Sequence, residues 1–242
     1  MEQNPGLEKD GATLLMVAID GPSGAGKSTV AKRLARELGY TYLDTGAMYR
    51  AIAWAVLNKG LDPSDEVGLR RILATIRLEL IVEERGLRLI LNGHDVTEEL
   101  RTPEMSQMAS KVSEFKVVRD RMMELQRSMG SRGGMVAEGR DIGTVVFPEA
   151  DVKIYLDAAK PERARRRFLE LQAQVKGGTL DETLREMEER DRRDQERAVA
   201  PLRKAEDAVV IDSTSFGVEF VVDRIMREVR KKQGPNPRKR GD

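Results

Sequence analysis

Short apolar runs alternate with stretches of helical periodicity along most of this chain. The runs that predict β-strands are Leu14–Ile19, Tyr40–Leu43, Met135–Glu138, Val152–Leu156 and Ala208–Ile211. After the first run, Val30, Leu34 and Leu38 mark one face of a helix that Gly39 ends. Regular alternation of strand and helix is typical of a parallel sheet covered by helices on both faces. We therefore predict an α/β fold of three layers around a five-stranded parallel sheet.

Between residues 61 and 104 the period of the pattern changes. Apolar side chains stand at every second position over 78–82 and again over 87–91, which is a strand period. Gly86 is expected to turn the chain between these strands, and Asn92-Gly93 is a strong hairpin signal. This segment therefore predicts a small antiparallel sheet inserted into the main domain.

Further helices are expected around the inserted sheet. A short helix is predicted near 66–76. Thr102-Pro103 is typical of a helix cap with proline in the first turn, which predicts a helix at 103–112 and another at 115–129.

The composition limits the classes of function. Lys and Arg total 42 and Asp and Glu total 41, so no net field recruits nucleic acid or a membrane. The absence of cysteine and the single His94 exclude disulfides, thiolate metal sites and histidine-cluster metal sites. No apolar run approaches ~18 residues, and the N-terminus lacks a signal pattern. We therefore expect a cytoplasmic protein without a membrane span.

A glycine-rich stretch between the first predicted strand and helix carries the clearest functional signal. Gly21-Pro22-Ser23-Gly24-Ala25-Gly26-Lys27-Ser28-Thr29 fits the phosphate-binding pattern G-x-x-x-x-G-K-[ST]. In this context the backbone N–H groups can surround a polyphosphate at a helix N-terminus. Lys27 can reach the β/γ-phosphates, and the Ser28 hydroxyl can ligate Mg²⁺. A dinucleotide-binding fingerprint would need a glycine at Thr29, so that interpretation fails.

Polar residues follow two other predicted strands, at the sheet edge where ligands bind in such folds. Thr45, Tyr49 and Arg50 follow the second strand at the start of a helix, and a hydroxyl with an arginine suits a phosphate. Alternatively, Thr45 only caps the helix and Arg50 is solvated. Arg140 and Asp141 follow the third strand beside glycines, and they form either a ligand site or a structural ion pair.

The segment from Asp157 to Pro201 is the richest in charge. Arg190, Arg193, Asp194 and Arg197 are spaced i, i+3, i+4 and i+7, so they share one helix face. Guanidinium groups with one carboxylate suit phosphate oxygens and a ribose diol. A mixed charge run is usually a solvated helix face. In a phosphate-loop protein, an arginine-rich helical hairpin more often serves as a closing lid.

Several of these stretches closely resemble the bacterial cytidylate kinase family of nucleoside monophosphate kinases. The matching stretches are Ile19–Thr29, Leu43–Arg50, Glu138–Pro148, Val152–Asp157, Glu189–Leu202 and Asp212–Thr214. They span residues 14–230, while the N-terminal extension and the basic C-terminal tail match nothing in the family. Several relatives carry Ser at Thr45 and Asp at Glu138. The resemblance implies transfer of the γ-phosphoryl group of ATP to CMP or dCMP with Mg²⁺.

The resemblance also implies roles for individual residues. Lys27, Arg140 and Arg190 would be catalytic. ATP would contact Gly21, Pro22, Ser23, Gly24, Ala25, Gly26, Lys27, Ser28 and Thr29. The CMP site would comprise Thr45, Tyr49, Arg50, Ser110, Arg119, Arg140, Asp141, Arg190, Asp194 and Arg197. Asp141 would accept from the cytosine amine and disfavour uracil, which has a carbonyl there. Arg163, Arg165 and Arg166 are equal candidates for the transferred phosphate.

These expectations divide the chain into segments with separate roles. Residues 14–60, 105–157 and 201–230 form the core of a P-loop fold. Residues 61–104 form the inserted monophosphate-binding region that the family implies, and 158–200 form the arginine-rich lid. Residues 1–13 are a flexible extension, and 231–242 are a flexible basic tail.

Three alternatives differ in the ligand that the chain would bind. The nearest is a P-loop kinase for another nucleoside monophosphate or a small metabolite. A GTP-driven switch would need an Asn-Lys-x-Asp motif, which Asn58-Lys59-Gly60-Leu61 fails at its last position. RNA binding has only the basic tail in its support. We expect a monomer whose partners are ATP and CMP or dCMP, and not nucleic acid.

Overall fold

The computed structural model describes residues 14–83, 86–173 and 178–233. Its main sheet has the strand order β2-β6-β1-β7-β8, and every neighbouring pair is parallel. The strands are β1 (Met16–Asp20), β2 (Thr41–Asp44), β6 (Met135–Gly139), β7 (Val152–Asp157) and β8 (Val209–Asp212). The predicted five-stranded parallel sheet is confirmed.

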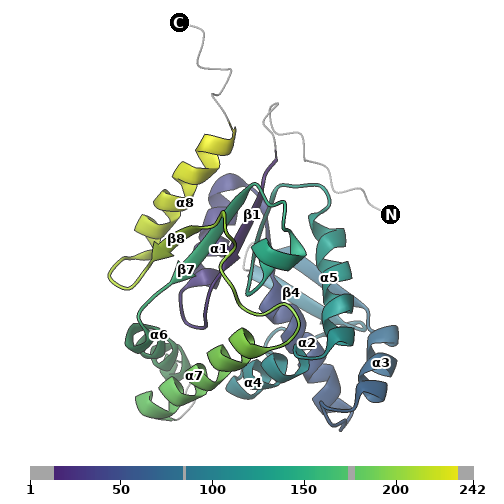
Figure 1. The fold of residues 1–242 in the computed structure, drawn as a ribbon. Helices are drawn as coiled ribbons and strands as arrows, with labels where there is room; N and C mark the ends of the chain where they lie inside the picture. The colour runs from purple at the N-terminus through teal and green to yellow at the C-terminus, as the bar shows by residue number, and fades with distance from the viewer. Residues whose placement is uncertain (1–13, 84–85, 174–177, 234–242) are drawn as a thin grey trace, which may run out of the picture.

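Helices cover both faces of this sheet, because the side chains of each strand alternate between the two faces. From β1, Val17 and Ile19 pack with α1 (Lys27–Leu38) and α8 (Val218–Gln233) in one apolar cluster. Met16 and Ala18 belong to a second cluster, with α2 (Thr45–Asn58), α4 (Pro103–Val112) and α5 (Lys116–Gly130). Figure 1 shows the resulting three layers.

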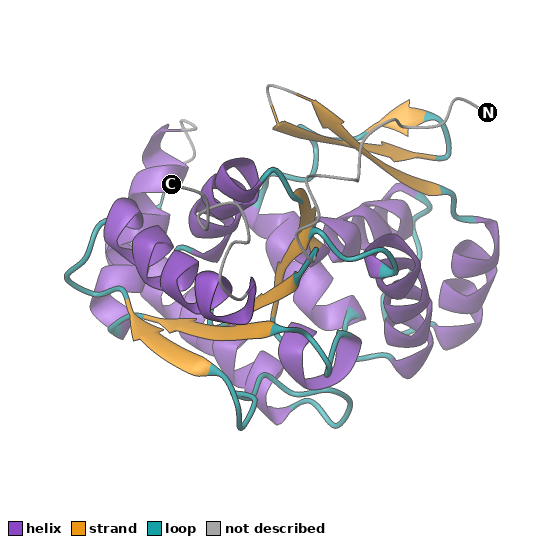
Figure 2. Ribbon diagram, turned by 90° about the horizontal axis from the view of Figure 1, so that it is seen from above, coloured by secondary structure: helices purple, strands orange, loops and turns teal. Residues whose placement is uncertain are grey.

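The inserted segment forms a separate three-stranded antiparallel sheet, as predicted (Figure 2). Its elements are α3 (Glu66–Thr75), β3 (Leu78–Glu83), β4 (Gly86–Leu91) and β5 (His94–Asp95). Asn92 and Gly93 form the second turn with φ angles of 50° and 83°. Gly86, expected to turn the chain, is instead the first residue of β4 and pairs with Glu83, while residues 84–85 lie outside the described part of the chain. Leu78 and Leu91 join the cluster beneath α2, so the insert shares the core of the main domain.

Two antiparallel helices, α6 (Lys160–Ala173) and α7 (Leu180–Glu196), form a hairpin beside α4 (Figure 1). A capping box between Thr179 and Glu182 begins α7. Buried positions of this hairpin include charged residues, namely Arg163, Asp191 and Asp194. The Asp194–Arg140 ion pair and the contacts of Arg163 and Asp191 with Ser23 therefore help to hold the hairpin to the core.

One boundary prediction was wrong. Residues 231–233, expected in the basic tail, belong to the last turn of α8. Lys231 pairs with Glu228 at 2.9 Å, and cations in the last turn also favour the helix dipole. Residues 1–13 and 234–242 lie outside the described residues. Among those that the structure describes, none of the helices combines the length and apolar character that a membrane span requires.

Candidate functional site

The glycine loop links β1 to α1 and lines a cavity of about 560 Å³. Gly26 caps α1 in the left-handed conformation, and α1 starts at Lys27. Gly21 has a φ of 149°, and a Cβ there would lie 2.0 Å from the carbonyl oxygen of Leu156. The loop can therefore pass beneath β7 only with glycine at this position.

Lys27 is buried at the base of this loop. Its Nζ donates to the carbonyl oxygen of Pro22 at 2.6 Å. Burial, followed by the positive field of Arg140, lowers the pKa of Lys27 to about 7. Glu138 and Asp191 raise this pKa only in part, so the charged form of Lys27 can gain further stabilisation from an anionic ligand in the cavity.

Glu138, near the end of β6, lies beside the loop with two hydroxyl partners. Tyr42 donates to its Oε1 at 2.8 Å, and the Ser28 hydroxyl lies near enough to lower the pKa of the same carboxylate. Burial, followed by the negative field of Asp44, raises the pKa of Glu138. The exposed Ser28 hydroxyl and the buried Glu138 carboxylate thus lie near each other in the lining of the cavity.

The start of α2 brings the next predicted residues to the cavity. Asp44 caps the helix by accepting from the amide of Ala47 at 2.8 Å. Thr45 Oγ1 instead donates to the carbonyl oxygen of Glu138 at 2.7 Å, so the interpretation of Thr45 as the helix cap is wrong. Arg50 pairs with Asp44 at 3.1 Å and also lines the cavity.

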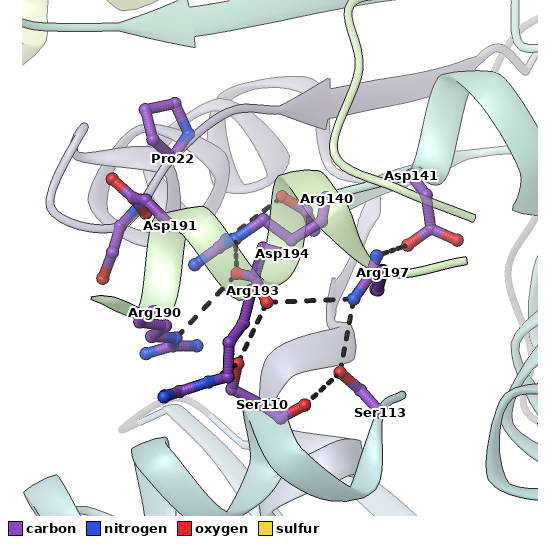
Figure 3. A network of polar contacts seen from close by, with 12 residues as sticks. Pro22, Ser110, Ser113, Arg140, Asp141, Arg190, Asp191, Arg193, Asp194 and Arg197 are labelled. Atoms are coloured by element: carbon purple, nitrogen blue, oxygen red, sulfur yellow. Dashed lines mark hydrogen bonds and ion pairs between the residues drawn. The ribbon is translucent and has the colours of Figure 1, made fainter. Parts of the chain in front are cut away.

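Asp194 of α7 lies at the centre of a network of cations (Figure 3). Its carboxylate pairs with Arg140 at 2.9 Å, Arg197 at 3.9 Å and Arg190 at 4.0 Å. It also accepts from Ser110 Oγ at 3.2 Å. Burial alone would raise the pKa of Asp194, but these arginines, Arg140 foremost, hold it below its usual value.

The positive charge around Asp194 is not fully compensated. Burial, followed by the field of Arg140, lowers the pKa of Arg190 to about 10. Arg190 Nε is buried and has no hydrogen-bond partner among the described residues. A buried donor without a partner is costly, so this part of the cavity favours an anionic ligand.

Asp141 and Arg197 also line the cavity and belong to a second charged cluster. One carboxylate oxygen accepts a hydrogen bond from Arg119, and the other pairs with Arg197 at 3.3 Å. Arg197 also donates to Ser113 Oγ at 3.3 Å. The Arg119 guanidinium stacks over the Tyr49 ring, 5.6 Å from its centroid. These groups offer both donors and acceptors to a planar ligand.

The three arginines of α6 that were predicted as equal candidates have different environments. Arg163 is buried, and its Nη1 donates to the carbonyl oxygen of Ser23 at 2.8 Å and to Asp191. Asp191 in turn accepts from the Ser23 amide at 3.0 Å. Arg165 and Arg166 line the cavity, whereas Arg163 braces the glycine loop from behind.

The structure brings most of the predicted site residues to this one cavity. Those that line it are Ser23, Gly24, Ala25, Gly26, Lys27, Ser28, Thr29, Thr45, Tyr49, Arg50, Ser110, Arg140, Asp141, Arg190, Asp194 and Arg197. Gly21, Pro22 and Arg119 lie behind the lining. Asp191 and Ser113 were not predicted as site residues. No motif or spacing in the sequence distinguishes either residue from its neighbours.

Comparison with known proteins agrees with this geometry. The family model for cytidylate kinase matches residues 17–231. A cytidylate kinase of Geobacter sulfurreducens is 48% identical over 92% of this chain and 96% of its own length. One of Pelotomaculum thermopropionicum is 51% identical over 88% of this chain and 95% of its own. A bifunctional pantoate ligase/cytidylate kinase of Synechococcus elongatus is 49% identical over 89% of this chain and 42% of its own. The chain belongs to the cytidylate kinase family.

Proposed function

We propose that this protein is an ATP-dependent cytidylate kinase that reversibly converts CMP or dCMP to the diphosphate. One observation carries the proposal: a phosphate loop lines the same cavity as Asp141 and Arg197, which form a charged cluster with Arg119. The loop suits the donor's phosphates, and the cluster suits an amino-pyrimidine.

The donor would bind through the loop amides, with Lys27 on the β/γ-phosphates. Mg²⁺ would be held by the Ser28 hydroxyl and, through water, by Glu138. No group of three acidic or histidine side chains that could hold a metal occurs in the described ranges. Mg²⁺ commonly takes one or two protein oxygens and fills its shell with phosphates and water, so this donor set fits it. The bound ion would neutralise charge on the phosphate oxygens.

ATP binding is expected to take up protons above pH 7. The pKa of Lys27 is about 7 in the free protein, so much of this lysine is neutral at pH 8. Phosphate oxygens favour its charged form and raise that pKa. Calorimetry at pH 8, in buffers of different ionisation enthalpy, should show uptake that Lys27→Met reduces by about one proton at most. Equal uptake by the variant would contradict this assignment.

The acceptor would bind between the core and the lid. Thr45, Arg50 and Arg140 would hold its phosphate, and Arg190 would join them from α7. Asp194 would accept from the ribose hydroxyls. Asp141 would accept from the cytosine amine, while Arg197 and Arg119, with Ser110, would complete base recognition. The uncompensated charge at Arg190 supports an anion here.

Phosphoryl transfer in this cavity needs no general base, because the phosphate of a nucleoside monophosphate is already a competent nucleophile. The protein would align the two substrates and neutralise charge through Lys27, Arg140 and Arg190. Arg165 and Arg166 are candidates for contact with the transferred group, since both line the cavity. The α6–α7 hairpin, as a lid, would exclude water, which otherwise accepts the phosphoryl group.

Asp141→Asn is expected to relax discrimination against UMP. Its amide can donate to the uracil carbonyl, whereas the carboxylate repels it, so the CMP/UMP ratio of kcat/KM should fall about tenfold or more. Steady-state assays with CMP, UMP, AMP and shikimate measure this ratio, with the exposed Asp223→Asn as the matched control. Turnover of a non-cytidine acceptor equal to that of CMP in the parent protein would contradict the proposed function. Unchanged selectivity in the variant would remove Asp141 from base recognition.

Three further predictions concern organisation. The division of the chain into core, insert and lid is a proposal, as are the monomeric state and the cytoplasmic location. Light scattering after size-exclusion chromatography would measure the mass in solution, and cell fractionation would give the location.

A further inference from the structure

Asp20, the last residue of β1, is a buried carboxylate that the proposed reaction does not use. It is 4% exposed and does not line the cavity. Its Oδ1 accepts from the amide of Ile142 at 2.8 Å, and its Oδ2 accepts from the amide of Gly143 at 2.7 Å. Both carboxylate oxygens therefore serve one backbone segment more than a hundred residues away.

That segment is η1 (Ile142–Val146), a single turn of π-helix that follows Asp141. Its own hydrogen bonds include those from Val146 to Asp141 at 3.1 Å and from Phe147 to Ile142 at 2.7 Å. The first amides of a helix have no partner within it, and Asp20 accepts from two of them. At the other end, Arg127 of α5 donates to the carbonyl oxygens of Val145 and Val146 at 2.8 and 2.9 Å. Side chains from distant elements thus hold both ends of the turn.

Asp141 stands at the N-cap position of η1 but makes no side-chain cap there. An aspartate at this position normally accepts from the first amides of its own helix. Here Asp20 already accepts from the amide of Gly143, the second residue of η1, and the Asp141 carboxylate instead pairs with Arg119 and Arg197.

We propose that Asp20 is a positioning residue that caps η1 in place of Asp141, and so leaves the Asp141 carboxylate available to the acceptor's base. This inference rests on the proposed function. Asp20 directly precedes Gly21, the first residue of the glycine loop. Its hydrogen bonds therefore also connect η1, which follows Asp141, to the start of this loop. The recognition of cytosine thus depends on a side chain that does not touch the nucleotide.

The test compares Asp20→Asn with the parent protein. The amide keeps the volume but has one acceptor oxygen, so one amide of η1 loses its partner and competes for Asp141. We expect KM for CMP to rise about tenfold, and the CMP/UMP ratio of kcat/KM to fall by a similar factor. KM for ATP should change less than about threefold, and thermal unfolding checks that the variant is folded. A merely structural role would not change selectivity.

A double variant makes the test specific to Asp141. In the Asp141→Asn background, Asp20→Asn should add little further loss of selectivity, because both changes act through the same carboxylate. Additive losses, or equal rises in KM for ATP and CMP with unchanged selectivity, would overturn the inference.

The Arg127→Gln substitution weakens the hydrogen bonds to the carbonyl oxygens of Val145 and Val146 at the other end of η1. It should therefore also lower the CMP/UMP selectivity. This variant decides the question if Asp20→Asn does not fold, and unchanged selectivity in it would then count against the inference. A parent protein without CMP kinase activity would contradict the proposed function instead. The two failures are therefore distinguishable.

Discussion

Replacing Lys27 with methionine is expected to lower kcat for phosphoryl transfer about 10³-fold, the largest effect of any single change considered. The Lys27 ammonium group lies at the base of the glycine loop, and its only hydrogen bond in the described structure is to the Pro22 carbonyl oxygen. Charge builds on the phosphate oxygens in the transition state, and Lys27 is the cation of the glycine loop that would neutralise it on the donor's β- and γ-phosphates. Coupled assays of ADP formation at saturating ATP and CMP measure the loss.

The same variant is not expected to lose stability. Burial disfavours the charged form of Lys27, which is why its pKa falls to about 7, so an apolar side chain of similar length suits the site. Thermal unfolding at pH 7 should give a Tm no lower than that of the parent. Lys59→Met, at an exposed position after α2, is the matched control and should change neither quantity. A large fall in Tm with modest loss of kcat would assign Lys27 a structural role instead.

The sheet was predictable from the sequence. Strands that are buried on both faces of a sheet consist of continuous apolar residues, and such short runs are easy to recognise. The π-helical turn η1 was not. Its sequence, Ile142-Gly143-Thr144-Val145-Val146, has apolar and β-branched residues that are compatible with a strand. Hydrogen bonds that Asp20 accepts and Arg127 donates hold it as a turn, and local propensity carries no information about them.

The candidate site was predictable where spacing or strand position determined it. Asp194 and Arg197 meet because they lie three apart at the C-terminal end of α7, where Arg197 is the C-cap residue. Asp141 meets Arg197 because ligand-facing residues follow the strands of a parallel sheet. The roles of the α6 arginines were not predictable. Arg163 and Arg166 lie three apart on the same helix, yet one is buried behind the glycine loop and the other lines the cavity. Only the packing of α6 against the loop separates them.

Asp194→Ala is expected to lower the free energy of unfolding by about 3–5 kcal/mol, because removing one partner of a buried ion pair leaves the others uncompensated. Arg140, Arg190 and Arg197 all lie within 4.0 Å of this carboxylate, which is 4% exposed. Since its pKa is lowered in the folded state, its stabilisation is present above the usual aspartate pKa. It is lost as the pH falls through the lowered value.

Urea unfolding of the parent and the variant, at pH 7 and in acid, therefore tests the assignment with a defined sign. The difference in free energy of unfolding should be large at pH 7 and shrink in acid. Asp120→Ala removes a carboxylate from an exposed pair with Lys116 and should cost at most about 1 kcal/mol. CMP binding should weaken only in the Asp194 variant, because the ribose hydroxyls lose their acceptor. If Asp194→Ala were as stable as Asp120→Ala, other groups would neutralise the charges of Arg140, Arg190 and Arg197. Asp194 would then not be the residue that holds α7 to the core.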